Sequence, residues 1–270
     1  MLRFLYIIFF LSVFASNAFA LISFKQSKVI TSDSDQIRGI NFKPDGTIMY
    51  VTERQGDPDT VLQYSLSVPF DVSTATLSSQ TSIHPVTLPH VIVFKPDGTR
   101  MFIVKNTGTK IEQFSLSTPW QTSTLNHEGT FNVSGESQLR TITFKPDGTE
   151  MYTVSTNNDR VSQFTLSTAW DISTATYDSK SYDSSSLLTG DEHLSFTFNA
   201  DGSAVYLAEN YPNRKVYQFT LSTNFDISTA SYSNKNLDFT SETSLGRPHF
   251  TFTNDGTKLF IINTFHTAGY

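Results

Sequence analysis

The sequence predicts an all-β protein built from a tandem repeat, and two observations carry this prediction. A segment with the pattern Phe-x-x-Asp-Gly-(Thr/Ser) occurs five times in 270 residues, and its phenylalanines are 52, 50, 54 and 54 residues apart. No window of the chain shows the apolar periodicity of an amphipathic helix. Four short strands in each unit of about 50 residues are typical of the blades of a β-propeller, which is the fold class that we expect.

The repeated segments are identical in three units and closely similar in the other two. They occupy residues 42–47, 94–99, 144–149, 198–203 and 252–257. A second block, Gln-(Tyr/Phe)-(Ser/Thr)-Leu-Ser, follows in the first four units at residues 63–67, 113–117, 163–167 and 218–222. We therefore expect one propeller domain at residues 21–270, with repeat units at about residues 37–81, 89–131, 139–182, 193–239 and 247–270.

The third unit shows how the strands are expected to lie. Alternating apolar residues predict a first strand at 141–144 and a second strand at 151–154, joined by a tight Pro-Asp-Gly turn. Proline presets φ, and the glycine can take the positive φ that closes such a hairpin. A third strand is expected at 161–166 and a fourth at 176–182, with Trp170 packing beneath the connection between them.

The repeat resembles that of a known group of proteins. The pattern F-x-P-D-G-[TS]-x-h-[YF]-h, where h is apolar, resembles the repeats of TolB-like and YVTN-type β-propellers, which belong to the lactonase-like propeller superfamily. The resemblance extends over essentially all of residues 21–270. It implies the propeller fold and leaves the function open, because those families include enzymes, periplasmic scaffold proteins and adhesive surface proteins.

The fifth unit is incomplete. It stops at Tyr270, where the other units begin their third strand. One arrangement is an imperfect ring of five units, in which residues 21–30 supply a fourth strand to the last blade. The other is a fragment of a larger ring, which in the resembling families commonly has seven blades. The sequence favours the fragment, because a sheet edge left open promotes aggregation.

The first twenty residues have the features of an export signal. Arg3 supplies a positive charge, residues 4–14 are almost wholly apolar, and residues 18–20 give the Ala-x-Ala pattern of a cleavage site. The apolar run is shorter than the about 20 residues that span a bilayer core. We therefore expect cleavage after Ala20 and a secreted, periplasmic or cell-surface protein without stable membrane insertion.

The composition excludes several kinds of site. There is no cysteine, which excludes disulfides, thiolate catalysis and cysteine-ligated metals. The net charge of −6 argues against a general nucleic-acid binder, which needs a basic face. The 23 phenylalanines and 11 tyrosines supply the packing that must stabilise the fold. The oligomeric state stays open.

The two faces of the predicted propeller differ in their residues. One face carries the repeated turns, whereas the loops of the other face vary from unit to unit, as expected of a surface adapted to a ligand. Just before the first strands of the units lie Arg38, His90, Arg140, His193, Arg247 and His249. After the second strands lie Glu53, Lys105, Glu209 and Asn210. Because the first strand of a blade is the innermost, we expect these residues to surround one mouth of the central channel.

These residue types predict the chemistry of the ligand. Arginine presents a planar donor fork that matches a carboxylate, and asparagine both donates to and accepts from hydroxyls. The leading interpretation is a non-enzymatic binding or scaffold propeller that holds a protein partner, a glycan or an anionic ligand at this mouth. Two alternatives stay open: a lactonase-like hydrolase with a metal at the channel mouth, and a structural repeat module of a larger adhesin or tail protein.

Metal and cofactor sites have weaker support in the sequence. The six histidines show no zinc-binding spacing. A calcium site that uses Glu53, Glu209 and Asn210 stays open, because calcium takes oxygen ligands and lactonase-like propellers carry such a site. The aspartates of the five repeated turns are expected to stabilise the turns. No cofactor is expected.

Overall fold

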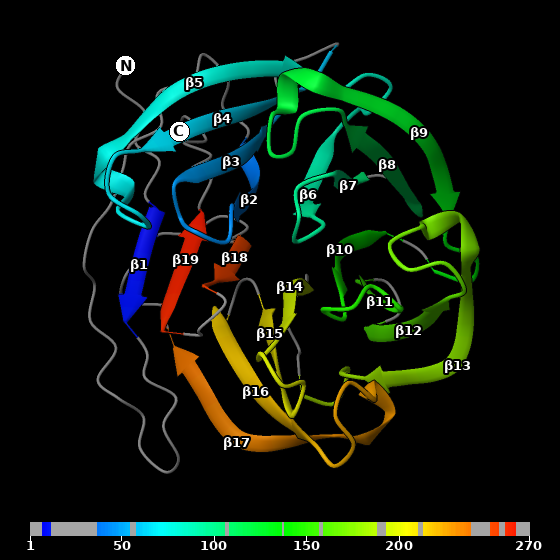
Figure 1. The fold of residues 1–270 in the computed structure, drawn as a ribbon. Helices are drawn as coiled ribbons and strands as arrows, with labels where there is room; N and C mark the ends of the chain where they lie inside the picture. The colour runs from blue at the N-terminus through cyan, green and yellow to red at the C-terminus, as the bar shows by residue number, and fades with distance from the viewer. Residues whose placement is uncertain are drawn as a thin grey trace, which may run out of the picture.

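The computed structural model describes residues 7–11, 37–54, 58–105, 108–136, 138–156, 159–187, 193–209, 213–238, 249–253 and 257–262. Five antiparallel sheets stand around a common axis (Figure 1). Four of them have four strands each and the fifth has three. The predicted all-β propeller with an incomplete fifth unit is therefore confirmed. Among the described residues, no helix is long and apolar enough to cross a membrane.

The four complete sheets follow the chain from the innermost to the outermost strand. The first sheet contains β2 (Ile37–Phe42), β3 (Ile48–Glu53), β4 (Thr60–Leu66) and β5 (Ala75–Ser82). The second contains β6 (Pro89–Phe94), β7 (Arg100–Lys105), β8 (Lys110–Leu116) and β9 (Leu125–Asn132). The third contains β10 (Leu139–Phe144), β11 (Glu150–Ser155), β12 (Arg160–Leu166) and β13 (Ala175–Asp183). The fourth contains β14 (His193–Phe198), β15 (Ala204–Glu209), β16 (Lys215–Leu221) and β17 (Ala230–Asp238).

The innermost strands close into a circle of five. The innermost strand of the fifth sheet, β18 (His249–Phe252), contacts both β14 of the fourth sheet and β2 of the first sheet. The other innermost strands contact their neighbours in the order β2, β6, β10 and β14. The sheets thus form the five-unit ring, one of the two arrangements that the sequence allowed. In this ring β18 lies between β14 and β2. The hypothesis of a fragment of a larger propeller stays a prediction.

An N-terminal strand completes the fifth sheet. This sheet has the order β1-β19-β18, so β1 (Ile7–Leu11) occupies the position that a third strand has in the other sheets. Its partner β19 (Lys258–Ile262) runs antiparallel to it, with Ile7 opposite Ile262 and Leu11 opposite Lys258. Figure 1 shows β1 in blue beside β19 in red. The added strand therefore comes from the segment that the sequence predicts to be an export signal, and residues 21–30 lie outside the described residues.

The repeated turn and the repeated aromatic residue stabilise each other. In the third unit, Gly148 has φ of 74° and the Trp170 ring lies against it, so that a Cβ at this glycine would be 2.1 Å from Trp170 Nε1. Trp170 N–H donates to the Gly148 carbonyl at 3.0 Å, and Asp147 accepts from Thr149 N–H at 2.9 Å. Trp170 thus packs on the hairpin turn rather than beneath the connection after the third strand. The aspartate acts within its own turn.

The repeated glutamine joins neighbouring sheets. A short 3-10 helix lies between the third and fourth strands of each complete sheet, at Val72–Thr74, Thr122–Thr124, Ile172–Thr174 and Ile227–Thr229. Gln113 Oε1 accepts from Ile172 N–H of the next unit at 3.0 Å, and Gln163 Oε1 accepts from Ile227 N–H at 3.1 Å. Since a buried N–H without a partner is costly, these bonds fix the second sheet against the third and the third against the fourth.

Thr153 offers a test of the packing between sheets. It is fully buried in β11, and its hydroxyl has no hydrogen-bond partner. The corresponding residues of the other complete units are Val51, Ile103 and Leu207. Because an unpaired buried hydroxyl destabilises a protein by about 1–3 kcal/mol, Thr153→Val is expected to raise the free energy of unfolding by about 1 kcal/mol or more. Denaturant unfolding measures this change.

A matched variant gives the opposite result. Thr52 is also fully buried, in β3, but its hydroxyl accepts from Gly39 N–H at 2.7 Å. Thr52→Val leaves that N–H unpaired and is expected to destabilise the protein by about 1–3 kcal/mol. Equal effects of the two substitutions would contradict the hydrogen bonding described for these strands.

Candidate functional site

The innermost strands begin with a bulge on the face of the variable loops. The register between the first two strands shifts between Pro89 and Val91 in the second sheet and between Leu139 and Thr141 in the third. The shift in the first sheet lies between Ile37 and Ile40. The additional residues include His90 and Arg140, and Arg38 lies in the corresponding stretch of β2. A bulge changes the direction of the side chain that it carries, so these three residues are presented differently from the rest of their strands.

Two histidines from distant parts of the chain meet at this end of the channel. The rings of His90 in β6 and His249 in β18 are 4.3 Å apart between centroids and 73° apart in plane. His90 Nδ1 lies 2.8 Å from the Arg140 carbonyl oxygen. A carbonyl oxygen can only accept, so Nδ1 of His90 carries the proton and its Nε2 is an acceptor. His249 Nε2 lies 3.4 Å from that acceptor and 3.0 Å from His90 Nδ1.

A serine completes this hydrogen-bonded chain. Phe250 N–H donates to Ser195 Oγ at 3.1 Å, and this oxygen also lies 3.2 Å from His249 Nδ1. His90 Nδ1–H donates to the Arg140 carbonyl, and His249 Nε2 lies beside the His90 ring. These contacts link four innermost strands. No sequence pattern indicated Ser195.

Burial and the two arginines keep both histidines neutral. His90 and His249 are almost inaccessible to solvent. Burial and, to a smaller extent, the charges of Arg38 and Arg140 together lower the pKa of His249 to about 3. Burial also lowers the pKa of His90 well below its usual value, with further lowering by His249, Arg140 and Arg38 that outweighs the hydrogen bond to the Arg140 carbonyl. The positive charges of the two arginines therefore act on both imidazoles.

Gly39 holds the first two sheets close together beside this pair. A Cβ at Gly39 would lie 2.8 Å from the His90 carbonyl oxygen and 3.0 Å from Val91 Cα, both of which are backbone atoms. Only glycine allows β2 to approach β6 this closely. The approach fixes Arg38, the preceding residue, next to the strand that carries His90.

The acidic and basic residues at the ends of the second strands are bonded within their own sheets. Glu53 accepts from Thr60 Oγ1 at 2.9 Å and from Gln80 Nε2 at 3.3 Å. Lys105 Nζ lies 3.4 Å from Glu112 Oε1. These side chains lie on the predicted face, because the register pairs Glu53 with Ile37 and Lys105 with Pro89. No carboxylate of the described chain hydrogen-bonds to either histidine.

Glu209 is likewise bonded locally, by Tyr217 Oη at 2.8 Å and Asn213 Nδ2 at 3.0 Å. Glu209 belongs to the fourth sheet, whereas Glu53 belongs to the first. Among the residues that the structure covers, no group of three His, Asp or Glu side chains could hold a metal ion. His193 starts β14 and pairs with Glu209 in register. Arg247 and Asn210 lie outside the described residues, and the calcium hypothesis stays a prediction.

The structure also shows buried acids that the sequence did not indicate. Glu112 accepts from His127 Nε2 at 2.8 Å and from the Thr130 hydroxyl. Burial opposes its ionisation, but the bonds from Thr130 and His127 and the charge of Lys105 lower the pKa of Glu112. These residues differ from their counterparts in the other units, so the repeat pattern contains no signal for them.

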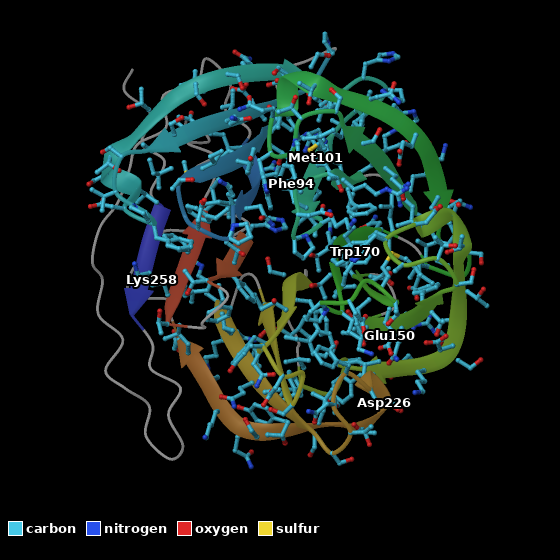
Figure 2. All side chains as sticks on the ribbon, in the orientation of Figure 1. Phe94, Met101, Glu150, Trp170, Asp226 and Lys258 are labelled. Atoms are coloured by element: carbon cyan, nitrogen blue, oxygen red, sulfur yellow. The ribbon has the colours of Figure 1, made fainter. Side chains whose placement is uncertain are left out.

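A cavity of about 220 Å³ occupies the other half of the channel. The innermost strands of all five sheets line it, and the turn residues Pro44 and Pro96 place it on the side of the repeated turns. Figure 2 labels Phe94 of its wall, which lies on the inner side of the second sheet, close to Met101. The sequence predicted a binding site only on the opposite face, because the repeated turns were expected to serve folding alone.

Comparison with known proteins supports the fold. No family model and no curated protein match this sequence. Among solved structures, a putative 6-phosphogluconolactonase from Bacteroides fragilis aligns with a TM-score of 0.57 and 13% identity over 95% of this chain and 87% of its own. A putative 6-phosphogluconolactonase from Bacteroides uniformis aligns with a TM-score of 0.51 and 17% identity over 75% of this chain.

A functionally unknown protein from Desulfotomaculum acetoxidans also aligns, with a TM-score of 0.51 and 15% identity over 87% of this chain. The present chain spans 55% of the length of the Bacteroides uniformis protein and 63% of that of the Desulfotomaculum acetoxidans protein. At such low identity these similarities show the propeller fold and nothing more.

Proposed function

We propose that the protein is an exported, non-enzymatic binding propeller that holds a small, polyhydroxylated carboxylate, such as a sugar acid or the acidic end of a glycan, at the arginine-containing end of its channel. The observation that carries this proposal is the convergence of Arg38 and Arg140 on a pair of histidines that stay neutral. Their positive charges favour an anionic ligand, and a guanidinium group binds a carboxylate through two parallel hydrogen bonds.

The surroundings of the histidines favour binding over hydrolysis. General acid and base catalysis requires a group that exchanges protons near neutral pH. The pKa of His249 is lowered to about 3 by burial and the arginines, and Glu53 and Glu209 are held by hydroxyl and amide donors of their own sheets. The glutamine bonds hold neighbouring sheets among the first four together, which helps to preorganise a binding site.

A lactonase-like hydrolase is the second candidate. It is favoured by the structural similarity to the putative 6-phosphogluconolactonase from Bacteroides fragilis. Turnover of sugar lactones such as D-glucono-1,5-lactone, together with stabilisation by calcium, would support this candidate and contradict the non-enzymatic proposal. Absence of both in the full chain supports a binding protein.

The arginines provide the direct test of the proposed function. Arg38→Gln/Arg140→Gln is expected to weaken the binding of D-glucuronate about a hundredfold or more, because each charge-assisted hydrogen bond contributes about 1.5–3 kcal/mol. Isothermal titration calorimetry measures the affinity, and thermal unfolding shows whether the variant is folded.

Lys110→Gln is the matched control. Lys110 is exposed on β8, and its replacement removes a positive charge away from the channel. It is expected to leave the affinity unchanged at moderate ionic strength, since exposed charges are screened. Equal affinities of the wild type and the arginine variant would refute the proposed function.

A further inference from the structure

The cavity on the side of the repeated turns has a polar wall built by equivalent positions. The residue before the repeated phenylalanine of each unit faces the cavity, and these residues are Asn41, Val93, Thr143, Thr197 and Thr251. Each is only partly buried, in contrast to most of the residues beside it on its strand. Four of these five positions thus present a hydroxyl or an amide to the same space.

Two of these hydroxyls are available for a ligand. Among the residues that the structure describes, neither Thr143 nor Thr251 makes a side-chain hydrogen bond, whereas Asn41 Nδ2 donates to the Ile92 carbonyl at 3.2 Å, which orients its amide. Thr143 belongs to the third sheet and Thr251 to the fifth, so their hydroxyls approach the cavity from different sides. A hydroxyl both donates and accepts, which suits a ligand that carries several hydroxyls.

One side of the cavity is apolar. Val93 takes the place of the hydroxyl or amide in the second sheet, and the rim contains the aromatic rings of Phe70 and Trp120. Trp120 lies 5.3 Å from the Phe94 ring between centroids, so it is packed in place. Flat aromatic surfaces pack well against apolar faces of a ligand. The cavity therefore has polar groups on some sides and an apolar platform on another.

The lysines at this mouth are paired. Lys43 Nζ lies 2.7 Å from Asp45 Oδ2, Lys95 Nζ lies 2.7 Å from Asp97 Oδ2, and Lys145 Nζ lies 3.3 Å from Asp147 Oδ2. The first three repeated turns thus each neutralise their own lysine, whereas the fourth turn has Asn199 in place of a lysine. This mouth therefore offers no unpaired lysine to an anion, which favours a ligand without charge.

We propose that this cavity is a second binding site, for a neutral ring compound with several hydroxyls, such as a monosaccharide or a cyclic polyol. The hydroxyl groups at the edge of this ligand bind Thr143, Thr251 and the amide of Asn41. The C–H face of the ligand packs on Val93 and Trp120. The volume of about 220 Å³ is below the about 300–1,000 Å³ of sites for drug-sized molecules, which limits the ligand to a single ring. This site does not use the arginines of the proposed function.

The experiment titrates the full chain with D-glucose, D-galactose and myo-inositol by calorimetry. At least one of these compounds is expected to bind the wild type, and Thr143→Val/Thr251→Val is expected to weaken that binding about tenfold or more for each hydroxyl removed. Thr153→Val is the control, because its hydroxyl is buried outside the cavity, and it is expected to keep the wild-type affinity.

The arginine variant separates this proposal from the proposed function. Arg38→Gln/Arg140→Gln is expected to bind the neutral compound like the wild type while it loses D-glucuronate. Failure of all three neutral compounds to bind, or equal affinities of the wild type and the threonine variant, would overturn the second site and leave the arginine site untouched.

A fluorescence measurement keeps the proposal testable if the threonine variant does not fold. The chain has two tryptophans, so Trp170→Phe leaves Trp120 at the cavity rim as the single emitter. The neutral compound is expected to change this emission with the same midpoint as in the calorimetry. Binding that leaves the Trp120 emission unchanged would place the compound elsewhere and overturn the proposal.

Discussion

A protein that begins at Leu21 is expected to unfold about 10 °C below the full chain and to self-associate. Such a protein lacks β1, which pairs with β19 along five residues. The loss of that pairing removes about 3 kcal/mol of net hydrogen bonding and exposes the edge of a strand whose residues Leu259 to Ile262 are fully buried. An open edge pairs with other chains. Thermal unfolding and size-exclusion chromatography of the two proteins test this expectation.

A peptide provides the control for this prediction. A synthetic peptide of residues 5–13, added to the shortened protein, is expected to restore the unfolding temperature, and a peptide of the same composition in scrambled order is not. Identical unfolding temperatures of the two proteins without peptide would contradict a structural role of β1.

This result bears on the predicted export signal. The same apolar segment is expected to direct export and is seen to complete the fifth sheet, so cleavage after Ala20 would remove the strand. Sequencing the N-terminus of the protein recovered from outside the cytoplasm distinguishes the two fates. A start at Leu21 in a stable, monomeric protein would show that another segment covers β19.

Acidification is expected to destabilise the protein well before its carboxylates are protonated. Both histidines are neutral when folded, with the pKa of His249 lowered to about 3 by burial and the arginines, whereas an unfolded histidine titrates at about 6.5. Below that pH the unfolded state takes up protons that the folded state does not. Stability is therefore full above pH 6.5 and falls towards pH 3, by up to about 1.4 kcal/mol per pH unit for each histidine.

Denaturant unfolding at a series of pH values between about 7 and 5 measures this slope. His90→Gln/His249→Gln removes both titrating groups and is expected to flatten the slope, whatever its effect on stability at pH 7. His84→Gln, at an exposed position, is expected to keep the wild-type slope. A wild-type stability that is constant over this range would contradict the buried neutral pair.

The fold could be predicted from the sequence because one pattern recurs in every unit. The alternation of apolar residues and the Pro-Asp-Gly turn place strands β10 to β13 within two residues of their observed bounds. The repeated glutamine was visible as a pattern, but its role was not. Gln113 acts on a backbone N–H of the following unit, and a pattern within one unit contains no information on contacts between units.

The site could be predicted only in part. The starts of the innermost strands of a propeller lie at one end of its channel. The sequence therefore predicted that Arg38, His90 and Arg140 lie in the same region. Their contacts depend on the bulges, and no residue in the sequence signals where a strand takes an additional residue. His249 lies one position further along its strand than His90 and therefore meets it across the channel.

The acidic residues at the ends of the second strands are bonded within their own sheets, whereas the charges of the two arginines act on His90 and His249, and this difference has a physical reason. A buried carboxylate needs hydrogen-bond donors, and Glu53 and Glu209 accept hydrogen bonds from donors of their own sheets. The cavity on the opposite face was not predicted, because Thr143, Thr197 and Thr251 fit the ordinary alternation of polar and apolar residues in a strand. Only the closed circle of five strands brings them to a common space.

The most direct test follows the imidazole NMR signals of His90 and His249 during a titration with D-glucuronate. If the ligand binds at the arginines, both sets of signals are expected to shift, with the same midpoint concentration of D-glucuronate as the calorimetric binding curve. In Arg38→Gln/Arg140→Gln the signals are expected to stay unchanged. Saturable binding of D-glucuronate to the wild type without any change in these signals would contradict the claim that the ring gathers its arginines and histidines into a ligand site.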